Sequence, residues 1–394
     1  MTFSAATVPP HAFPPLRLRG RSVHPIVQGG MGVGVSAHRL AGTVALHGAV
    51  GTLSSVDLRR HHPDLIGPTA RCLDKTLINA ANLTALDREI VAARQLSQGN
   101  GLVAVNVMRA VSEYAAYVRQ SCESGADAIV VGAGLPLDLP ELTANHPGVA
   151  LIPILSDVRG VAIVLKKWIR KHRLPDAIVI EHPRYAGGHL GAASIADLGD
   201  TRFDFEGVLE GLAALYRELG LEREQIPVVL AGGINSHDKV KRLISLGAAA
   251  VQIGTPFAVT QECDAHPNFK KVLAEARPED IVTFISAAGL PARAVRTPWL
   301  DTYLKRESRA QSHATKRTRC IMAFDCLLSC GLRDGIAKIG QFCIDNHLAA
   351  ALRGDIKKGL FFRGSESLPF GSAIRTVSEL LGYLLTGKTP TTAR

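Results

Sequence analysis

The stretch 226–255, IPVVLAGGINSHDKVKRLISLGAAAVQIGT, contains two apolar runs separated by one amphipathic segment. The first run ends in Gly232-Gly233 and the second ends in Gly254-Thr255. The apolar residues between them recur at helical spacing, and Asn235 or Ser236 can cap the start of that helix. A strand, a helix and a second strand joined by short turns form the repeating unit of parallel α/β folds.

The same unit recurs on the amino-terminal side of this stretch. Most of the runs contain Val, Ile, Leu and Ala without polar alternation, which is typical of parallel strands buried on both faces. Eight such runs alternating with helices favour a closed (β/α)8 TIM barrel over an open doubly wound sheet. The runs are residues 22–28, 49–53, 102–107, 128–132, 149–155, 177–181, 227–231 and 249–254. Helical patterns cover 80–98, 111–124, 161–172, 205–219 and 238–246.

The chain of 394 residues is longer than a minimal barrel, and we expect three parts. Residues 1–20 contain four prolines that block regular structure, so they form a flexible N-terminal segment. Residues 21–290 form the barrel. Residues 291–394 form a mostly helical, cysteine-containing extension that covers the barrel mouth, with helices expected at 348–352 and 374–385.

Composition and charge exclude several classes of protein. The net charge is +10, and basic residues gather in 293–319, but no nucleic-acid-reading motif or interleaved aromatic residues accompany them. We therefore expect no nucleic-acid partner. No apolar run reaches the roughly 20 residues that span a bilayer. The proline-rich N-terminus lacks a secretory signal core, which favours a cytoplasmic protein with reduced cysteines.

The two glycine corners at the ends of the last two strands predict an anion site. Gly232 and Gly233 follow the seventh run, and Gly254 and Thr255 end the eighth. Small residues let backbone N–H groups approach an anion, and TIM barrels commonly bind phosphate at these two loops. The alternative is that the glycines only make tight turns.

A histidine lies in a second glycine-rich loop, YAGGHLG at 185–191, directly after the sixth run. This position presents His189 at the carboxyl end of the strands, where barrel enzymes have their catalytic groups. A neutral imidazole is a suitable base near pH 7. A structural surface histidine is the alternative interpretation.

The loop after the first run, QGGMGVG at 28–34, does not fit the dinucleotide pattern G-x-G-x-x-G. It is better interpreted as a floor under a flat ring, with Met31 as a polarizable contact. Asn106 and Ser156 end the third and fifth runs. Each is either a satisfied core group or a hydrogen-bonding partner for a ligand.

Four cysteines near the carboxyl end could ligate zinc or an iron–sulfur cluster. They lack a C-x-x-C pair, and the alternative is that they are small buried apolar side chains. We therefore assign no metal ligands. The four residues are Cys320, Cys326, Cys330 and Cys343.

Four motifs together resemble the nitronate monooxygenases, formerly called 2-nitropropane dioxygenases, and the related FMN-dependent enoyl-ACP reductases. The resemblance covers about residues 25–257. It implies an FMN-dependent TIM-barrel enzyme, but it does not separate the branches of the superfamily. The motifs are QGGMG at 28–32, AGGH at 186–189, LAGGI at 230–234 and LGAAAVQIGT at 246–255.

The resemblance also implies roles for individual residues. His189 would be the catalytic base or would activate the substrate. The family usually has Glu where this chain has Tyr185, preceded by His182-Pro183-Arg184, so we expect substrate recognition to differ. The FMN contacts implied by the resemblance are Gly30, Met31, Gly32, Asn106, Gly188, Gly232, Gly233, Gly254 and Thr255.

The main functional hypothesis is oxidation of an alkyl nitronate by O2 to a carbonyl compound and nitrite. The alternatives are an NAD(P)H-dependent reductase of enoyl thioesters and a non-catalytic flavin- or metal-binding module. The first two hypotheses require a small-molecule substrate with O2 or NAD(P)H as redox partner. The sequence leaves the oligomeric state open, a homodimer included.

Overall fold

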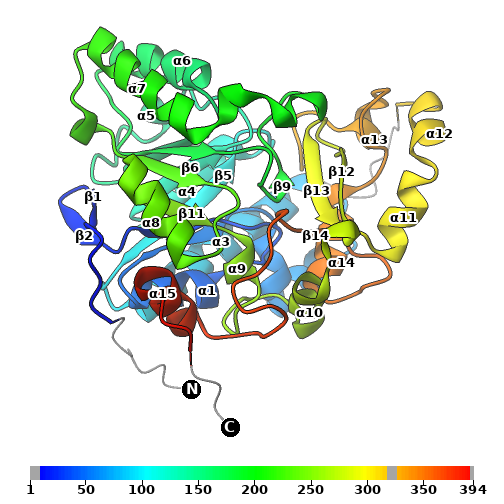
Figure 1. Ribbon diagram of the computed structural model, residues 1–394. Helices are drawn as coiled ribbons and strands as arrows, with labels where there is room; N and C mark the ends of the chain where they lie inside the picture. The colour runs from blue at the N-terminus through cyan, green and yellow to red at the C-terminus, as the bar shows by residue number, and fades with distance from the viewer. Residues whose placement is uncertain (1–8, 317–325, 391–394) are drawn as a thin grey trace.

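The computed structural model describes residues 9–316 and 326–390, and a closed barrel of eight parallel strands lies at its centre (Figure 1). The strands follow one another around the barrel in chain order, as in a TIM barrel, so the predicted fold class is confirmed. They are β3 (Ile26–Gln28), β4 (Val50–Ser54), β5 (Leu102–Met108), β6 (Ala128–Gly132), β7 (Ala150–Leu155), β8 (Ile178–Glu181), β10 (Val228–Ala231) and β11 (Ala250–Ile253).

Helices surround the barrel, and five of them overlap the helical patterns predicted at 80–98, 111–124, 161–172, 205–219 and 238–246, whereas the other five were not predicted. Ser236 is the cap of α8, because its hydroxyl accepts a hydrogen bond of 3.3 Å from the N–H of Lys239. Within the described ranges, no helix is both long and apolar enough to cross a membrane. The helices of the barrel region are α1 (His38–Leu46), α2 (Pro63–Thr69), α3 (Lys75–Ser97), α4 (Tyr114–Glu123), α5 (Leu139–Leu142), α6 (Val158–Ile169), α7 (Phe205–Leu219), α8 (His237–Leu246), α9 (Thr255–Ala258) and α10 (Pro267–Glu275).

The barrel closes where β11 pairs with β3, in the register Val251↔Ile26 to Ile253↔Gln28. On the other side of β3, the backbone ladder to β4 is short. The buried side chain of Gln28 supplements it, since its amide accepts from the N–H of Thr52 at 2.8 Å and donates to the carbonyl of Thr52 at 3.1 Å. A side chain thus links the two strands that the backbone joins least.

The N-terminal segment differs from the expectation. Leu16–Leu18 forms β1, which pairs antiparallel with β2 (Arg21–Val23), so regular structure begins before residue 20. The single strand expected at 22–28 is therefore wrong: β2 ends before Pro25, which has no N–H to donate, and β3 starts after it. Residues 1–8 lie outside the described residues.

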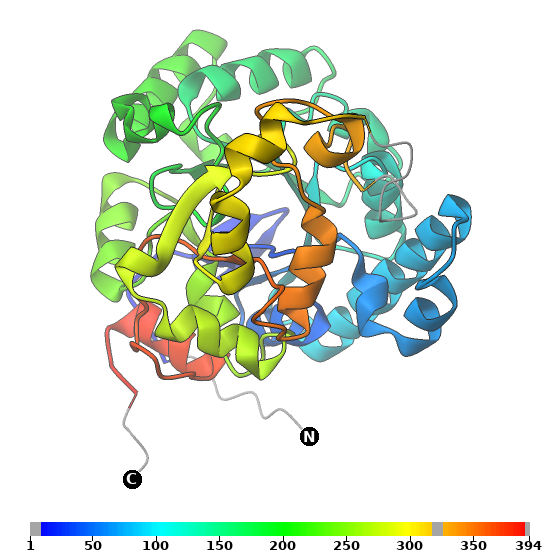
Figure 2. The same ribbon diagram turned by 90° about the vertical axis from the view of Figure 1, so that its right-hand side faces the viewer.

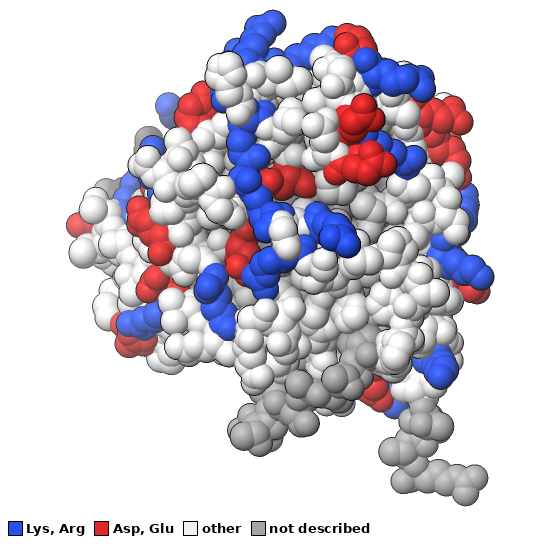
Figure 3. All heavy atoms as spheres, turned by 90° about the vertical axis from the view of Figure 1, so that its left-hand side faces the viewer, with Lys and Arg blue, Asp and Glu red and all other residues white. Residues whose placement is uncertain are grey.

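The β1–β2 hairpin closes the amino-terminal end of the barrel. Leu16, Leu18 and Val23 pack in one buried cluster with inward-facing side chains of the barrel strands. Arg19 and Arg21 at the turn pair with Asp176 at 3.0 Å and Asp127 at 3.1 Å. Basic and acidic side chains adjoin on this side of the molecule (Figure 3).

The opposite end of the barrel is covered by later segments. The antiparallel hairpin of β12 (Ile281–Ile285) and β13 (Pro291–Val295) spans residue 290, and β13 also pairs with β14 (Phe361–Phe362) and β9 (Gly188–His189). The hairpin and α14 lie across the open end of the barrel (Figure 2). The helices here are α11 (Pro298–Leu304), α12 (Glu307–Ser312), α13 (Gly331–Asp334), α14 (Ile344–Leu352) and α15 (Val377–Thr386).

A buried ion cluster joins α14 to the loop after β4. Arg60 pairs with Asp345 of α14 at 2.7 Å and also with Asp57, which Arg59 contacts at 2.7 Å. Both carboxylates are almost completely buried, and burial raises the pKa of Asp57. Because each ion has a partner of opposite charge, the cluster holds the two segments together.

We expect Arg60→Met to lower the free energy of unfolding by about 3–5 kcal/mol, because it leaves buried carboxylates without their shared cation. Urea denaturation measures this change. The matched control is Arg88→Met, which removes an exposed pair with Asp64 at 2.7 Å and should leave the free energy of unfolding nearly unchanged, because water screens the pair. Equal losses in the two variants would contradict the role of the buried cluster.

Candidate active site

A cavity of about 650 Å³ lies at the carboxyl ends of the barrel strands and under the covering segments. Its size is in the range of sites that enclose a cofactor or a drug-sized ligand. The structure brings together every site residue expected from the sequence. These residues are Gly30, Met31, Gly32, Asn106, Gly188, His189, Gly232, Gly233, Gly254 and Thr255, and all of them line this cavity.

The two glycine corners lie side by side because β10 and β11 are paired, with Ala231 opposite Gln252. Gly232 and Gly233 have φ values of +106° and +73°, a backbone conformation that favours glycine. A Cβ at Gly232 would also lie 2.9 Å from the carbonyl oxygen of His182. The corner can therefore be formed by glycine but not by larger residues without a shift of the backbone.

Gly254 differs from these glycines because nothing in the protein crowds it. Its φ is −106°, and the nearest atom to a Cβ built there is the sulfur of Met31 at 3.9 Å. The missing side chain thus leaves space that belongs to the cavity. The neighbouring Thr255 accepts a hydrogen bond of 3.0 Å from the N–H of Gly364 through its hydroxyl.

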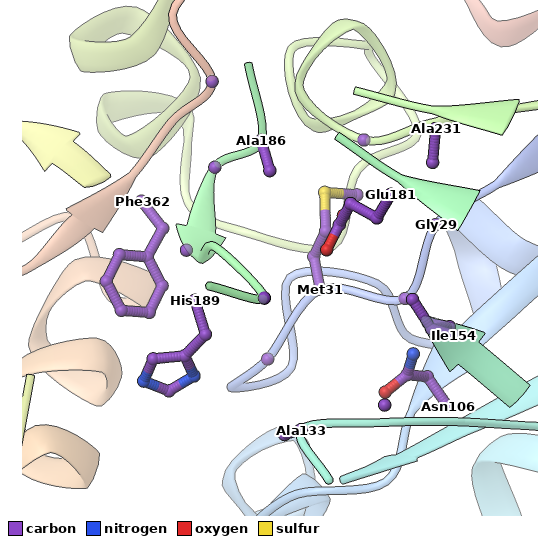
Figure 4. Close-up of a pocket in the computed structure, with 18 of the residues that line it drawn as sticks. Gly29, Met31, Asn106, Ala133, Ile154, Glu181, Ala186, His189, Ala231 and Phe362 are labelled. Carbon is purple, nitrogen blue, oxygen red and sulfur yellow. The ribbon is translucent and has the colours of Figure 1, made fainter. Parts of the chain in front are cut away.

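Met31 and Asn106 also line the cavity (Figure 4). The hydroxyl of Ser36 accepts a hydrogen bond of 2.8 Å from the N–H of Met31 and fixes the loop. The amide of Asn106 has no hydrogen-bond partner in the described part of the chain. It is therefore not a satisfied core group, and it can bind a ligand. Ser156, the similar case after β7, also lines the cavity.

His189 is held in place by the sheet that covers the barrel end. It lies in β9, opposite Ala292 of β13, and its Nε2 is 3.0 Å from the hydroxyl of Ser286. Burial lowers the pKa of His189 to about 4. The ring is therefore neutral at pH 7. The Ser286 oxygen accepts a hydrogen bond of 3.2 Å from the N–H of Ala288, so its hydroxyl proton is available to Nε2; in that tautomer Nδ1 carries the ring proton and has no partner among the described residues.

Three residues that sequence reasoning missed support this loop. Arg293 is buried and donates to the carbonyl oxygens of Pro183 and Ala186, so it is not part of an exposed basic surface. The ring of Phe362 lies 5.7 Å from the ring of His189, and Ser286 makes the hydrogen bond described above. These residues lie about 100 or more positions beyond His189, and no local motif marks them.

Three of the four cysteines near the carboxyl end lie among the described residues. Cys330 and Cys343 are buried in a hydrophobic cluster with Leu332 and Phe342. Among the described residues, no three His, Cys, Asp or Glu side chains form a group that could hold a metal ion. Cys320 lies outside the described residues.

Solved structures with this fold include FabK from Thermotoga maritima, with a TM-score of 0.61, 21% identity and coverage of 94% of this chain and 93% of that chain. A second is nitroalkane oxidase from Streptomyces ansochromogenes, with a TM-score of 0.62, 20% identity and coverage of 91% and 94%. At these identities the likeness shows the fold alone.

Relatives that share sequence similarity with this chain indicate its family, which the structural neighbours do not. The probable nitronate monooxygenase of Bacillus subtilis strain 168 is 27% identical over 288 residues, which cover 70% of this chain and 78% of the relative. The nitronate monooxygenase of Pseudomonas aeruginosa is 33% identical over 118 residues, which cover 30% and 31%. The family model named Nitronate monooxygenase matches residues 18–382, and the chain belongs to this family.

Proposed function

We propose that this protein is an FMN-dependent nitronate monooxygenase that converts alkyl nitronates and O2 into carbonyl compounds and nitrite. The main support is the convergence of paired glycine corners, an unpartnered amide and a neutral histidine on one cavity. Bound FMN would supply the electron-transfer chemistry with O2.

The volume of the cavity and its hydrogen-bonding groups are compatible with FMN. The corners at Gly232-Gly233 and Gly254-Thr255 would hold the phosphate, since they combine small residues with backbone N–H groups at paired strand ends. Met31, Gly30 and Gly32 would lie against the flat ring. Asn106 would donate or accept a hydrogen bond at the edge of that ring, because its amide has no partner among the described residues.

The environment of His189 favours nitronates over neutral nitroalkanes as substrates. An imidazole whose pKa is lowered to about 4 is a weak base for the α-proton of a nitroalkane. A nitronate has already lost this proton. His189 would then orient the nitronate through a hydrogen bond from its neutral ring, with Ser286 and Phe362 fixing the position of that ring.

We expect Gly254→Ala to weaken FMN binding at least tenfold without lowering the melting temperature, because the added methyl group projects into the cavity and not into protein atoms. Fluorescence titration of the apoprotein with FMN and thermal unfolding measure the two effects. Gly207→Ala in α7, where a Cβ meets no atom within 4 Å, is the matched control and should leave the affinity unchanged. Unchanged FMN affinity in Gly254→Ala would contradict the proposed phosphate corner.

We expect His189→Ala to retain FMN and to lower kcat/KM for propionate 3-nitronate about 100-fold, the effect typical of a residue that positions or protonates substrate. His189→Asn, which keeps a hydrogen-bond donor, should lose less. Stopped-flow spectra under anaerobic conditions and oxygen consumption measure the effect. Normal turnover by His189→Ala would rule out the assigned role, and rapid bleaching by NADH or NADPH would favour a reductase.

We expect the His189 ring to stay neutral until the pH approaches 4, because the charged ring would lose its hydration in the cavity. Carbon-13 NMR of labelled histidine measures this titration. His38 is the internal control, since its hydrogen bond to Glu89 raises its pKa above the ordinary value of about 6.5. A His189 midpoint at pH 6 or above would show that the ring is hydrated or paired with an anion.

A further inference from the structure

Glu181 is an acidic residue inside the cavity that the proposed function does not use. It is the last residue of β8, opposite Ala231 of β10, and it lines the cavity. Its side chain extends beside Met31 in the part of the cavity that also contains Asn106 (Figure 4). It is therefore close to the loop against which a flat ring would lie.

Glu181 differs from the other acidic residues that line the cavity. Asp157 accepts a hydrogen bond from the N–H of Gly160 at 2.8 Å, so it is the cap of α6. Asp345 pairs with Arg60 at 2.7 Å, and Glu366 pairs with Lys239 at 2.6 Å. The side chain of Glu181 has no hydrogen bond or ion pair within residues 9–316 and 326–390. Its partner must come from water or from a ligand.

The groups that face Glu181 from neighbouring elements are uncharged. They are Met31 after β3, Ile154 in β7, Ala231 in β10 and Gln252 in β11, all of which line the cavity. Burial alone raises the pKa of Glu181 to about 7. The remaining ionisable groups on the cavity wall are Tyr185, His189, Cys326 and Arg363, together with the three acidic residues described above.

We propose that Glu181 is a second ligand-recognising residue of this site, which binds the flavin ring as a neutral carboxylic acid by donating its O–H to a ring acceptor. This inference rests on the proposed function, since it requires a flavin in the cavity. A neutral acid satisfies a ring oxygen or nitrogen without the cost of a second buried charge. Its carbonyl oxygen can in turn accept from an N–H of the ligand.

If Glu181 binds the flavin as a neutral acid, the binding of flavin is accompanied by proton uptake. A glutamate with a purely structural role would not cause this uptake. Bound flavin displaces water from Glu181 and raises its pKa further, so the complex binds more protons than the free protein. Affinity is then constant well below pH 7 and falls up to about tenfold per pH unit above it. At pH 7.5, a group with a pKa near 7 would take up roughly three-quarters of a proton on binding.

Isothermal titration of the apoprotein with riboflavin tests this proposal, since riboflavin has no phosphate that titrates in the same range. Binding heats at pH 7.5 in buffers of different ionisation enthalpy give the number of protons taken up. We expect about three-quarters of a proton for the wild type and none for Glu181→Gln, which keeps the shape of the side chain. Glu218→Gln, which changes an exposed acid on α7 outside the cavity, is the matched control and should take up as many protons as the wild type.

The outcomes separate this inference from the proposed function. Riboflavin and FMN binding without proton uptake by the wild type would overturn the role of Glu181 and leave the cofactor assignment standing. Equal uptake by wild type and Glu181→Gln would also overturn it, because another group would then be titrating. If neither flavin binds, the proposed function itself fails.

Discussion

The pairing of β11 with β3 closes the barrel, and the site depends on that closure. Because all eight strands run parallel, closure brings their carboxyl ends to one end of the barrel, where residues from distant parts of the chain meet. The β1–β2 hairpin fills the amino-terminal end with Leu16, Leu18 and Val23. Small residues at the strand ends and in the loops that follow leave the cavity at the other end.

The sequence predicted the barrel because parallel strands buried on both faces are continuous apolar runs, and β4 to β8, β10 and β11 follow that pattern. It predicted the N-terminal segment poorly. Leu16–Leu18 and Arg21–Val23 are strands of three residues each, too short to show a periodicity, and their pairing depends on the barrel beneath them. The sheet formed by β9, β12, β13 and β14 joins segments far apart in sequence, so local patterns could not indicate it.

In the site too, local motifs could be recognised in the sequence, whereas contacts between residues far apart in the chain could not. The glycine corners and the AGGH loop are local motifs, and their expected residues all line one cavity. Ser286 and Phe362 reach His189 only through β-pairing across more than 90 residues, which no motif encodes. Glu181 was visible in the sequence, but a carboxylate at the end of an apolar strand cannot be distinguished there from a residue that simply ends the strand. Only the three-dimensional structure shows that its side chain has no partner among the described residues.

Burial shifts the pKa values of the two ionisable groups nearest the proposed ring site in opposite directions, and both shifts favour the neutral form. It lowers the pKa of His189 to about 4 and raises the pKa of Glu181 to about 7, so at pH 7 the histidine is neutral and the acid is about half protonated. The charged pair Lys239–Glu366 lies instead at the glycine corner, where Lys239 donates to the carbonyl of Gly233 at 2.8 Å. The cavity therefore presents neutral hydrogen-bonding groups from His189 and Glu181, together with an ion pair of no net charge at the glycine corner.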